Sequence, residues 1–209
     1  MIKSTFLKLS LLILGITLLM LSPSCNEKKE TQNKGEFTIS TSIIRDPSFL
    51  FPTKSVSNIE VEINQNIFLQ LANYHPHSFK LIPVLLESIP TGIKIDKGQF
   101  KGNIRYDCTI KKDASWDDSS PITGYDYLFT IKTLKIKEIQ TNPSIKSIFR
   151  QLKDVEINES DPKQFSIYVN EEYHLAKELA IITEVLPEYI YDSLKVFRGY
   201  NIVDGEIIP

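Results

Sequence analysis

Two neighbouring carboxylates beside an aromatic side chain are the first residues that could do chemistry in this chain. Asp117 and Asp118 follow Trp116, the single tryptophan, and a Ser-Ser-Pro sequence comes next. Such a pair can share a proton, act as acid and base, or hold a divalent cation. No histidine or nucleophile is placed in the sequence to work with it, so we favour a pair that shapes and solvates a turn over a catalytic pair.

Histidines and cysteines offer a second kind of chemistry. His75 and His77 flank a proline, and together with the distant His174 they could bind a transition metal, although a polar loop with two histidines is more often only a loop. The two cysteines, Cys25 and Cys108, show no spacing typical of a zinc site. Nothing assembles a nucleophile, a base and an oxyanion site. We therefore predict no metal, no cofactor and no enzyme activity.

The residues after the acidic pair are typical of a helix start. Thr123 and Asp126 have the spacing of a capping box, which predicts a helix over residues 124–139. Trp116 is then a large apolar anchor at the entry to this helix, and its indole N–H needs one partner. Phe129 is favoured as a core residue over a ligand contact. The whole stretch, with Asp118 in its turn, is predicted to be a packing motif.

The N-terminus has the features of an export signal. Lys3 and Lys8 precede a mostly apolar run, Leu9–Leu21, which is too short to span a bilayer comfortably. Cys25 follows where this run stops, and the polar residues 26–35 come next. The pattern resembles a bacterial lipoprotein signal, in which such a cysteine is lipidated. The alternative is an ordinary cleaved signal with a chance cysteine.

The sequence thus divides into a signal peptide over 1–24, a flexible tether over 25–35 and an ordered region over 36–209. Without the first 24 residues the formal net charge falls from −2 to −4, because they hold two lysines and no acid. A mildly acidic chain without a basic block is not typical of nucleic-acid binding. If Cys25 carries lipid, Cys108 is alone and no intrachain disulfide can form.

Strand and helix patterns follow each other in irregular order, which predicts one α+β (mixed α/β) domain. Residues 103–110 alternate cleanly between apolar and polar, which predicts a half-buried strand paired with 91–95. The other segments show helical or strand periodicity, short apolar runs or turn residues. We expect strands at 37–44 and 164–170, a loop at 45–55, and a turn of helix or an irregular covering segment at 79–90. Helices are expected to start near 57, 143, 173 and 187, the first with Ile59, Ile63, Ile67 and Leu71 at the spacing of one apolar face.

Several of these segments resemble bacterial extracellular solute-binding proteins of family 5, the peptide- and nickel-binding components of ABC importers. That family carries a strand, then Trp-x-Asp-Gly, a Pro-hydrophobic-Thr-Ala turn and an Asp-Val-x-Phe helix. The matching residues here are Trp116, Asp118, Pro121, Ile122, Thr123, Asp126 and Phe129. Ser119, Gly124 and Tyr127 stand where the family has glycine, alanine and valine. Further matches in the same order are Phe68, Leu71, Pro83, Leu85, Glu87, Ser88, Leu186 and Pro187.

The resemblance implies the N-terminal lobe of a periplasmic-binding-protein-like fold (class II, family 5), incomplete because family members are far longer and have two lobes. It implies a lipid-anchored substrate-binding component of a peptide-type ABC importer, here a truncated portion. Its partners would be the importer's membrane subunits, the membrane through the lipid, and a peptide or similar small solute if a second lobe is supplied. Nucleic acid is not among them. The location would be the cell envelope, facing the periplasm or the exterior.

In this family the loop after the first strand lies along the ligand cleft. The resemblance therefore points to Asp46, Phe49 and Phe51 as ligand-binding residues, while aromatics tucked under the loop as core are the alternative. The missing return strands are expected to leave an apolar edge or face of the sheet uncovered. The competing function is a small cell-envelope lipoprotein that acts only through protein–protein contacts, without binding a transported ligand.

Overall fold

The computed structural model describes residues 40, 42–54, 57–139 and 143–208. The chain forms two units, Met1–Ser42 and Ile43–Pro209, and the description below concerns the second. The predicted signal peptide over 1–24, the lipidation site Cys25 and the tether over 25–35 lie outside the described residues. Most of the strand predicted over 37–44 does too, and residues 42–44, which are described, are not in a strand.

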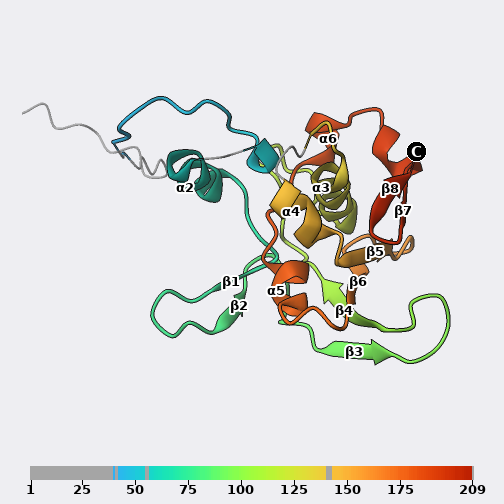
Figure 1. Ribbon diagram of the computed structural model, residues 1–209. Helices are drawn as coiled ribbons and strands as arrows, with labels where there is room; N and C mark the ends of the chain where they lie inside the picture. The colour runs from blue at the N-terminus through green and yellow to red at the C-terminus, as the bar shows by residue number, and fades with distance from the viewer. Residues whose placement is uncertain (1–39, 41, 55–56, 140–142, 209) are drawn as a thin grey trace, which may run out of the picture. The chain divides into compact units, whose positions relative to one another are not determined.

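An antiparallel sheet of four strands is the frame of the second unit (Figure 1). Its strand order is β3-β4-β6-β5. The bounds are β3 Gly92–Ile95, β4 Asn103–Thr109, β5 Leu152–Ile157 and β6 Gln164–Asn170. Two small hairpins accompany it, formed by β1 Ala72–Tyr74 with β2 Leu81–Pro83 and by β7 Asn201–Val203 with β8 Glu206–Ile208.

The central strand β4 forms as its alternating pattern predicts. Tyr106 and Cys108 are buried on one face, while Asp107 between them is exposed. The predicted hairpin with β3 is also confirmed, and the turn that joins the two strands places Gly98 and Gly102 at positive φ, where a residue without a Cβ is favoured. The α+β prediction therefore holds at the level of the sheet.

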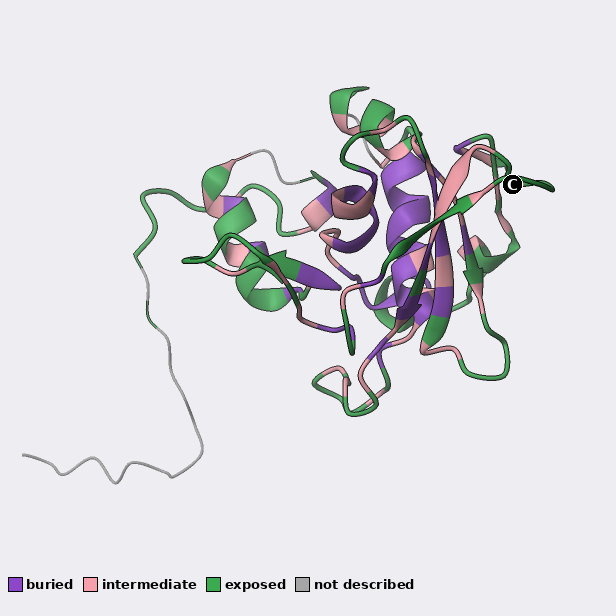
Figure 2. Ribbon diagram, turned by 90° about the horizontal axis from the view of Figure 1, so that it is seen from below, coloured by how far each residue is buried: buried purple, intermediate pink, exposed green. Residues whose placement is uncertain are grey.

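Helices cover the buried face of this sheet. The central one, α3, is almost entirely buried and lies against the sheet in Figure 2. It starts at Gly124 as predicted but ends at Lys135, four residues earlier than expected. The helices are α2 Asn58–Ile67, α3 Gly124–Lys135, α4 Pro143–Phe149, α5 Ala176–Ile181 and α6 Glu188–Tyr191, with 3₁₀ turns η1 Pro52–Lys54 and η2 Val196–Gly199. In the described ranges no helix is long and apolar enough to cross a bilayer.

The predicted apolar face of α2 forms only in part, since Ile59 and Ile63 are partly buried and Leu71, although buried, lies beyond the end of the helix. This helix buries Glu60 and Asn64, whereas Ile67, on its expected apolar face, is 54% exposed. The reason lies in hydrogen bonding, because the Glu60 carboxylate accepts the backbone N–H of Ser57 in a capping box and that of Ser48 at 2.8 Å. A buried acid that accepts three backbone N–H groups, the third from Phe49, thus shares the inward face of the helix with Ile59 and Ile63.

Two further segments differ from expectation. Residues 79–90 are irregular only in part, because β2 within them pairs with β1 in a hairpin, while the irregular remainder buries Leu85 and Leu86 in the core. The sheet face away from the helices is also not the uncovered apolar face that we expected. On it Asp107 accepts a hydrogen bond from Ser166 at 2.7 Å, and Phe100 stacks on Tyr168 with the ring centroids 3.8 Å apart. A sheet face that carries polar side chains and one stacked aromatic pair can face solvent without a second layer of helices or strands over it.

Candidate functional site

The stretch that begins at Trp116 builds a tight turn. Asp117 accepts the N–H of Asp118 at 3.0 Å, and Asp118 accepts the N–H and the hydroxyl of Ser120 at 2.9 and 2.6 Å. The hydrogen bonds from Ser120 lower the pKa of Asp118. Ser119 has a φ of 70°, in the left-handed region, which accounts for glycine at the equivalent place in the family pattern. Both carboxylates are exposed and engaged in the turn.

Asp126 links the start of α3 to a distant segment. Its carboxylate accepts the N–H of Thr123 at 2.8 Å in the predicted capping box and the N–H of Glu188 at 3.0 Å. Thr130, one turn along the helix, accepts the N–H of Leu186 at 2.8 Å. Burial raises the pKa of Asp126. The capping residue thus also fixes the segment around Leu186, which is another of the segments that resemble the family.

The three residues predicted to bind ligand differ in their burial. Phe51 packs against an apolar cluster of Phe68, Phe129 and Leu186, as the core alternative had it. Asp46 is exposed, and Phe49 is 55% exposed. A ligand role for Asp46 and Phe49 stays a prediction, and Phe51 contributes to the packing that positions their loop.

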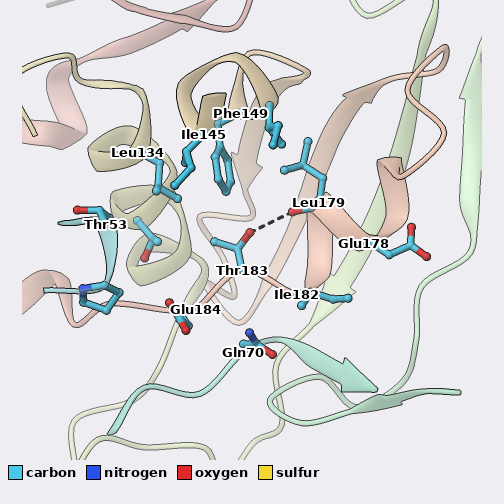
Figure 3. Close-up of a pocket in the computed structure, with 13 residues that line it drawn as sticks. Thr53, Gln70, Leu134, Ile145, Phe149, Glu178, Leu179, Ile182, Thr183 and Glu184 are labelled. Atoms are coloured by element: carbon cyan, nitrogen blue, oxygen red, sulfur yellow. Dashed lines mark hydrogen bonds between the residues drawn. The ribbon is translucent and has the colours of Figure 1, made fainter. Parts of the chain in front are cut away.

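A cavity of about 400 Å³ lies beside this loop, between η1, α3, α4, α5 and the segment that follows α5 (Figure 3). Its apolar lining includes Leu134, Ile145, Phe149, Leu179 and Ile182. Its polar lining includes Thr53, Gln70, Thr130, Thr183 and Glu184. Sequence reasoning missed this site because its residues come from five separate segments, and no local pattern marks them as neighbours.

The polar lining of this cavity offers several hydrogen-bond acceptors. The side-chain oxygen of Gln70 is buried and has no hydrogen-bond partner in the described part of the chain. Burial raises the pKa of Glu184. The hydroxyls of Thr130 and Thr183 donate to the carbonyls of Asp126 and Leu179 at 2.9 and 3.1 Å, and the second of these bonds is drawn in Figure 3.

A second cavity, of about 390 Å³, lies beside Trp116. The indole N–H of Trp116 is buried without a hydrogen-bond partner among the described residues, so the one partner that it was predicted to need is not found there. Apolar and aromatic side chains line the rest of this cavity, including Ile67, Leu69, Tyr189 and Ile190. These four side chains are exposed to solvent, which makes this cavity the centre of an apolar patch on the surface.

The histidines and the described cysteine have structural roles. His75 accepts the N–H groups of His77 and Ser78 at 3.3 and 3.2 Å within a turn. Among the described residues no group of three or more potential ligands is arranged to hold a metal ion. Cys108 is buried and free, and burial raises the pKa of its thiol to about 12, which disfavours the reactive thiolate at neutral pH.

The fold is similar to that of solved binding proteins. An oligopeptide-binding protein from Thermus thermophilus, solved with a pentapeptide, is 26% identical with a TM-score of 0.53, over 69% of this chain and 25% of that one. NikZ from Campylobacter jejuni, solved with Ni(L-His), gives 21% identity and a TM-score of 0.53, over 70% of this chain and 26% of that one. CtaP from Listeria monocytogenes, an ABC transporter substrate-binding protein, gives 18% and 0.51, over 74% and 29%.

These likenesses confirm the predicted fold class. The chain has the mixed α/β fold of family 5 solute-binding proteins and spans about a quarter of the length of the first two solved proteins. No protein-family model matches the sequence, and no curated protein sequence matches it. The neighbours are binding proteins associated with transport.

Proposed function

We propose that this chain supplies a ligand-binding lobe to the substrate-binding component of a peptide-type ABC importer. The observation that carries the proposal is the likeness in fold and sequence to an oligopeptide-binding protein over 69% of the chain. The ordered motif from Trp116 to Phe129 supports it, because the capping residue in that motif also positions the Leu186 segment. A cavity bordered by the loop that was predicted to bind ligand supports it as well.

The size of this cavity indicates how much of a ligand the lobe holds. A drug-sized ligand is enclosed by pockets of roughly 300–1,000 Å³, so about 400 Å³ suits one or two side chains of a peptide. In two-lobed binding proteins the ligand is held by closure of one lobe on the other. We therefore assign the rest of the ligand contacts to a second lobe. The location is proposed from the sequence alone: the cell envelope, with Cys25 carrying the lipid anchor.

Uptake of labelled peptides by cells that lack the gene tests this function. Uptake of tri- to pentapeptides is expected to fall when the gene is deleted and to return when the full chain is supplied. The control is uptake of a labelled free amino acid, which should not change. Unchanged peptide uptake in the deletion strain would refute the importer role.

The competing function, a lipoprotein that acts only through protein contacts, is favoured by one observation. Ile67, Leu69 and Ile190 expose apolar side chains around the Trp116 cavity. Under that function, charged substitutions such as Leu69→Lys would release a co-purifying envelope protein while peptide uptake stays at the wild-type rate. Under the importer function the deletion itself lowers peptide uptake, so the two readouts separate the candidates.

A further inference from the structure

We propose that the cavity between η1, α3, α4 and α5 binds an organic cation, a primary ammonium or guanidinium group carried on an apolar stem. This inference rests on the proposed function, because it names the class of solute group that the same cavity takes. Its chemistry is that of a lysine or arginine side chain, or of an amino terminus beside an apolar side chain.

The charge of the lining carries the first step. The lining includes two carboxylates, Glu178 and Glu184, and no lysine, arginine or histidine from the described part of the chain. The Glu178 carboxylate accepts a hydrogen bond from Tyr74 at 3.1 Å, and Figure 3 shows it directed away from the other labelled residues. The negative charge available to a ligand is therefore that of Glu184.

Glu184 itself carries the second step. No described residue donates a hydrogen bond to its carboxylate or forms an ion pair with it. Burial raises its pKa, and burial is the sole cause of the shift. A partly buried carboxylate without a partner is unfavourable, and a cation placed against it removes that penalty. The chain itself provides no such cation at this place in its described residues.

The uncharged groups carry the third step, because they present acceptor oxygens to the cavity. The buried side-chain oxygen of Gln70 lacks a donor within the described ranges. Thr130 and Thr183 use their hydroxyl hydrogens on backbone carbonyls. An ammonium brings three donors to these oxygens and a guanidinium brings five, whereas a carboxylate ligand would meet the like charge of Glu184.

The apolar wall selects what carries the cation. Leu134, Ile145, Phe149 and Leu179 lie across the cavity from Gln70 and Glu184 in Figure 3, and Ile182 adds a further apolar side chain to the lining. A hydrated inorganic ion gains nothing from such a wall, but an alkyl or arylalkyl stem gains by being buried there. The combination of an acceptor side and an apolar side fits an amphipathic cation.

Three probes of matched shape and different charge test the proposal. They are 2-phenylethylammonium, 2-phenylethanol and 3-phenylpropanoate, titrated at pH 7.5 into the purified full chain and followed by backbone amide chemical shifts. The ammonium is expected to bind at least tenfold more tightly than the alcohol and to shift the amides of Gln70 and Thr183. The anion is expected to bind most weakly.

Glu184→Gln keeps the size of the side chain and removes its charge. It is expected to weaken binding of the ammonium by about tenfold or more, as the loss of one charge-assisted hydrogen bond would do, and to leave the alcohol unchanged. Glu172→Gln, the matched control, removes one exposed carboxylate outside the cavity and should leave both affinities unchanged. Equal affinity for all three probes, or an equal effect of the two variants, would overturn the proposal.

These outcomes are distinct from those of the uptake experiment. Selective binding of the ammonium with unchanged peptide uptake would uphold the cation pocket and refute the importer role. Lost peptide uptake without any preference for the cationic probe would do the reverse.

Discussion

Lys135 is a buried cation that joins four segments of the chain. It is 2% exposed, and its ammonium group donates to the carbonyls of Phe149, Leu152 and Gly205. These acceptors lie at the end of α4, at the start of β5 and in the turn of the β7–β8 hairpin. Burial lowers the pKa of Lys135 to about 7. One side chain thus ties the last hairpin to the central helix.

The first prediction concerns this lysine and its pH dependence. Lys135→Met is expected to lower the free energy of unfolding by about 3 kcal/mol at pH 7, because three buried carbonyls lose their donor. The folded-state pKa of about 7 lies below the ordinary value of 10.5, so between these values the unfolded chain binds more protons. The contribution of Lys135 therefore rises with pH across this window.

Urea unfolding at pH 7, 8.5 and 10 measures both effects. The deficit of Lys135→Met relative to the wild type should grow as the pH rises, and Lys137→Met, at an exposed position, should show neither effect. A deficit that shrinks between pH 7 and pH 10 would contradict the lowered pKa.

The second prediction concerns the stability of Glu184→Gln without ligand. A carboxyl whose pKa is raised by folding stabilises the folded state only while it is protonated, and this contribution is lost as the pH rises through its folded-state pKa. At pH 7 the charged carboxylate of Glu184 therefore destabilises the folded state, and replacing Glu184 with glutamine should raise the unfolding midpoint in urea slightly. At pH 4 the advantage should vanish. A variant that is less stable than the wild type at pH 7 would mean that Glu184 already has a partner.

At the scale of elements, the start of α3 has a larger role than a helix cap. The third prediction is that Asp126→Ala lowers the free energy of unfolding by about 2–4 kcal/mol, because the N–H groups of Thr123 and Glu188 both lose their acceptor. Asp117→Asn is the control, since its amide oxygen can still accept the N–H of Asp118, and it should cost less than about 1 kcal/mol. Equal losses in chemical denaturation would refute the difference in role.

Elements with a local cause could be predicted from the sequence. Two such causes are the apolar–polar alternation around Tyr106 and Cys108 and the capping-box spacing of Thr123 and Asp126. Each of these patterns is complete within a few consecutive residues. The orientation of α2 could not be predicted, because Glu60 is held by Ser48, twelve residues away. The β1–β2 hairpin was missed for a related reason, since Pro83 at the end of β2 indicated irregular structure.

The cavities were harder still to predict, because their lining residues are far apart in the sequence. Gln70 and Glu184 lie more than a hundred positions apart, and they meet because their backbones form an isolated antiparallel bridge. An isolated bridge has no sequence pattern of its own. The resemblance to solute-binding proteins predicted the fold, but its loop residues Asp46, Phe49 and Phe51 do not line this cavity. The residues of that loop that do line the cavity are Pro52 and Thr53, which follow Phe51 in the sequence.

At the scale of the whole molecule, the fourth prediction concerns Cys25 and the place of the protein in the cell. Diacyl and amide-linked chains bury several tens of methylenes, each worth about 0.8 kcal/mol, so lipidation would hold the chain at a membrane. Cys25→Ser is expected to move the protein to the soluble fraction or to leave it unprocessed. Labelling with a fatty-acid analogue, followed by fractionation, measures this. If the wild type and Cys25→Ser are both soluble, cleaved and unlabelled, the N-terminus is an ordinary secretory signal and not a lipoprotein signal.

The single tryptophan gives this molecule a built-in optical reporter. Trp116 borders the cavity near Leu69 and Tyr189 and is absent from the lining of the cavity near Glu184. Its emission spectrum therefore responds to the polarity of one cavity and not directly to that of the other. A titration that shifts the emission concerns the apolar patch, and one that changes the amides of Thr183 and Gln70 without it concerns the acceptor-lined cavity. Occupancy of the two cavities can thus be followed separately in one sample, without attaching a fluorescent dye.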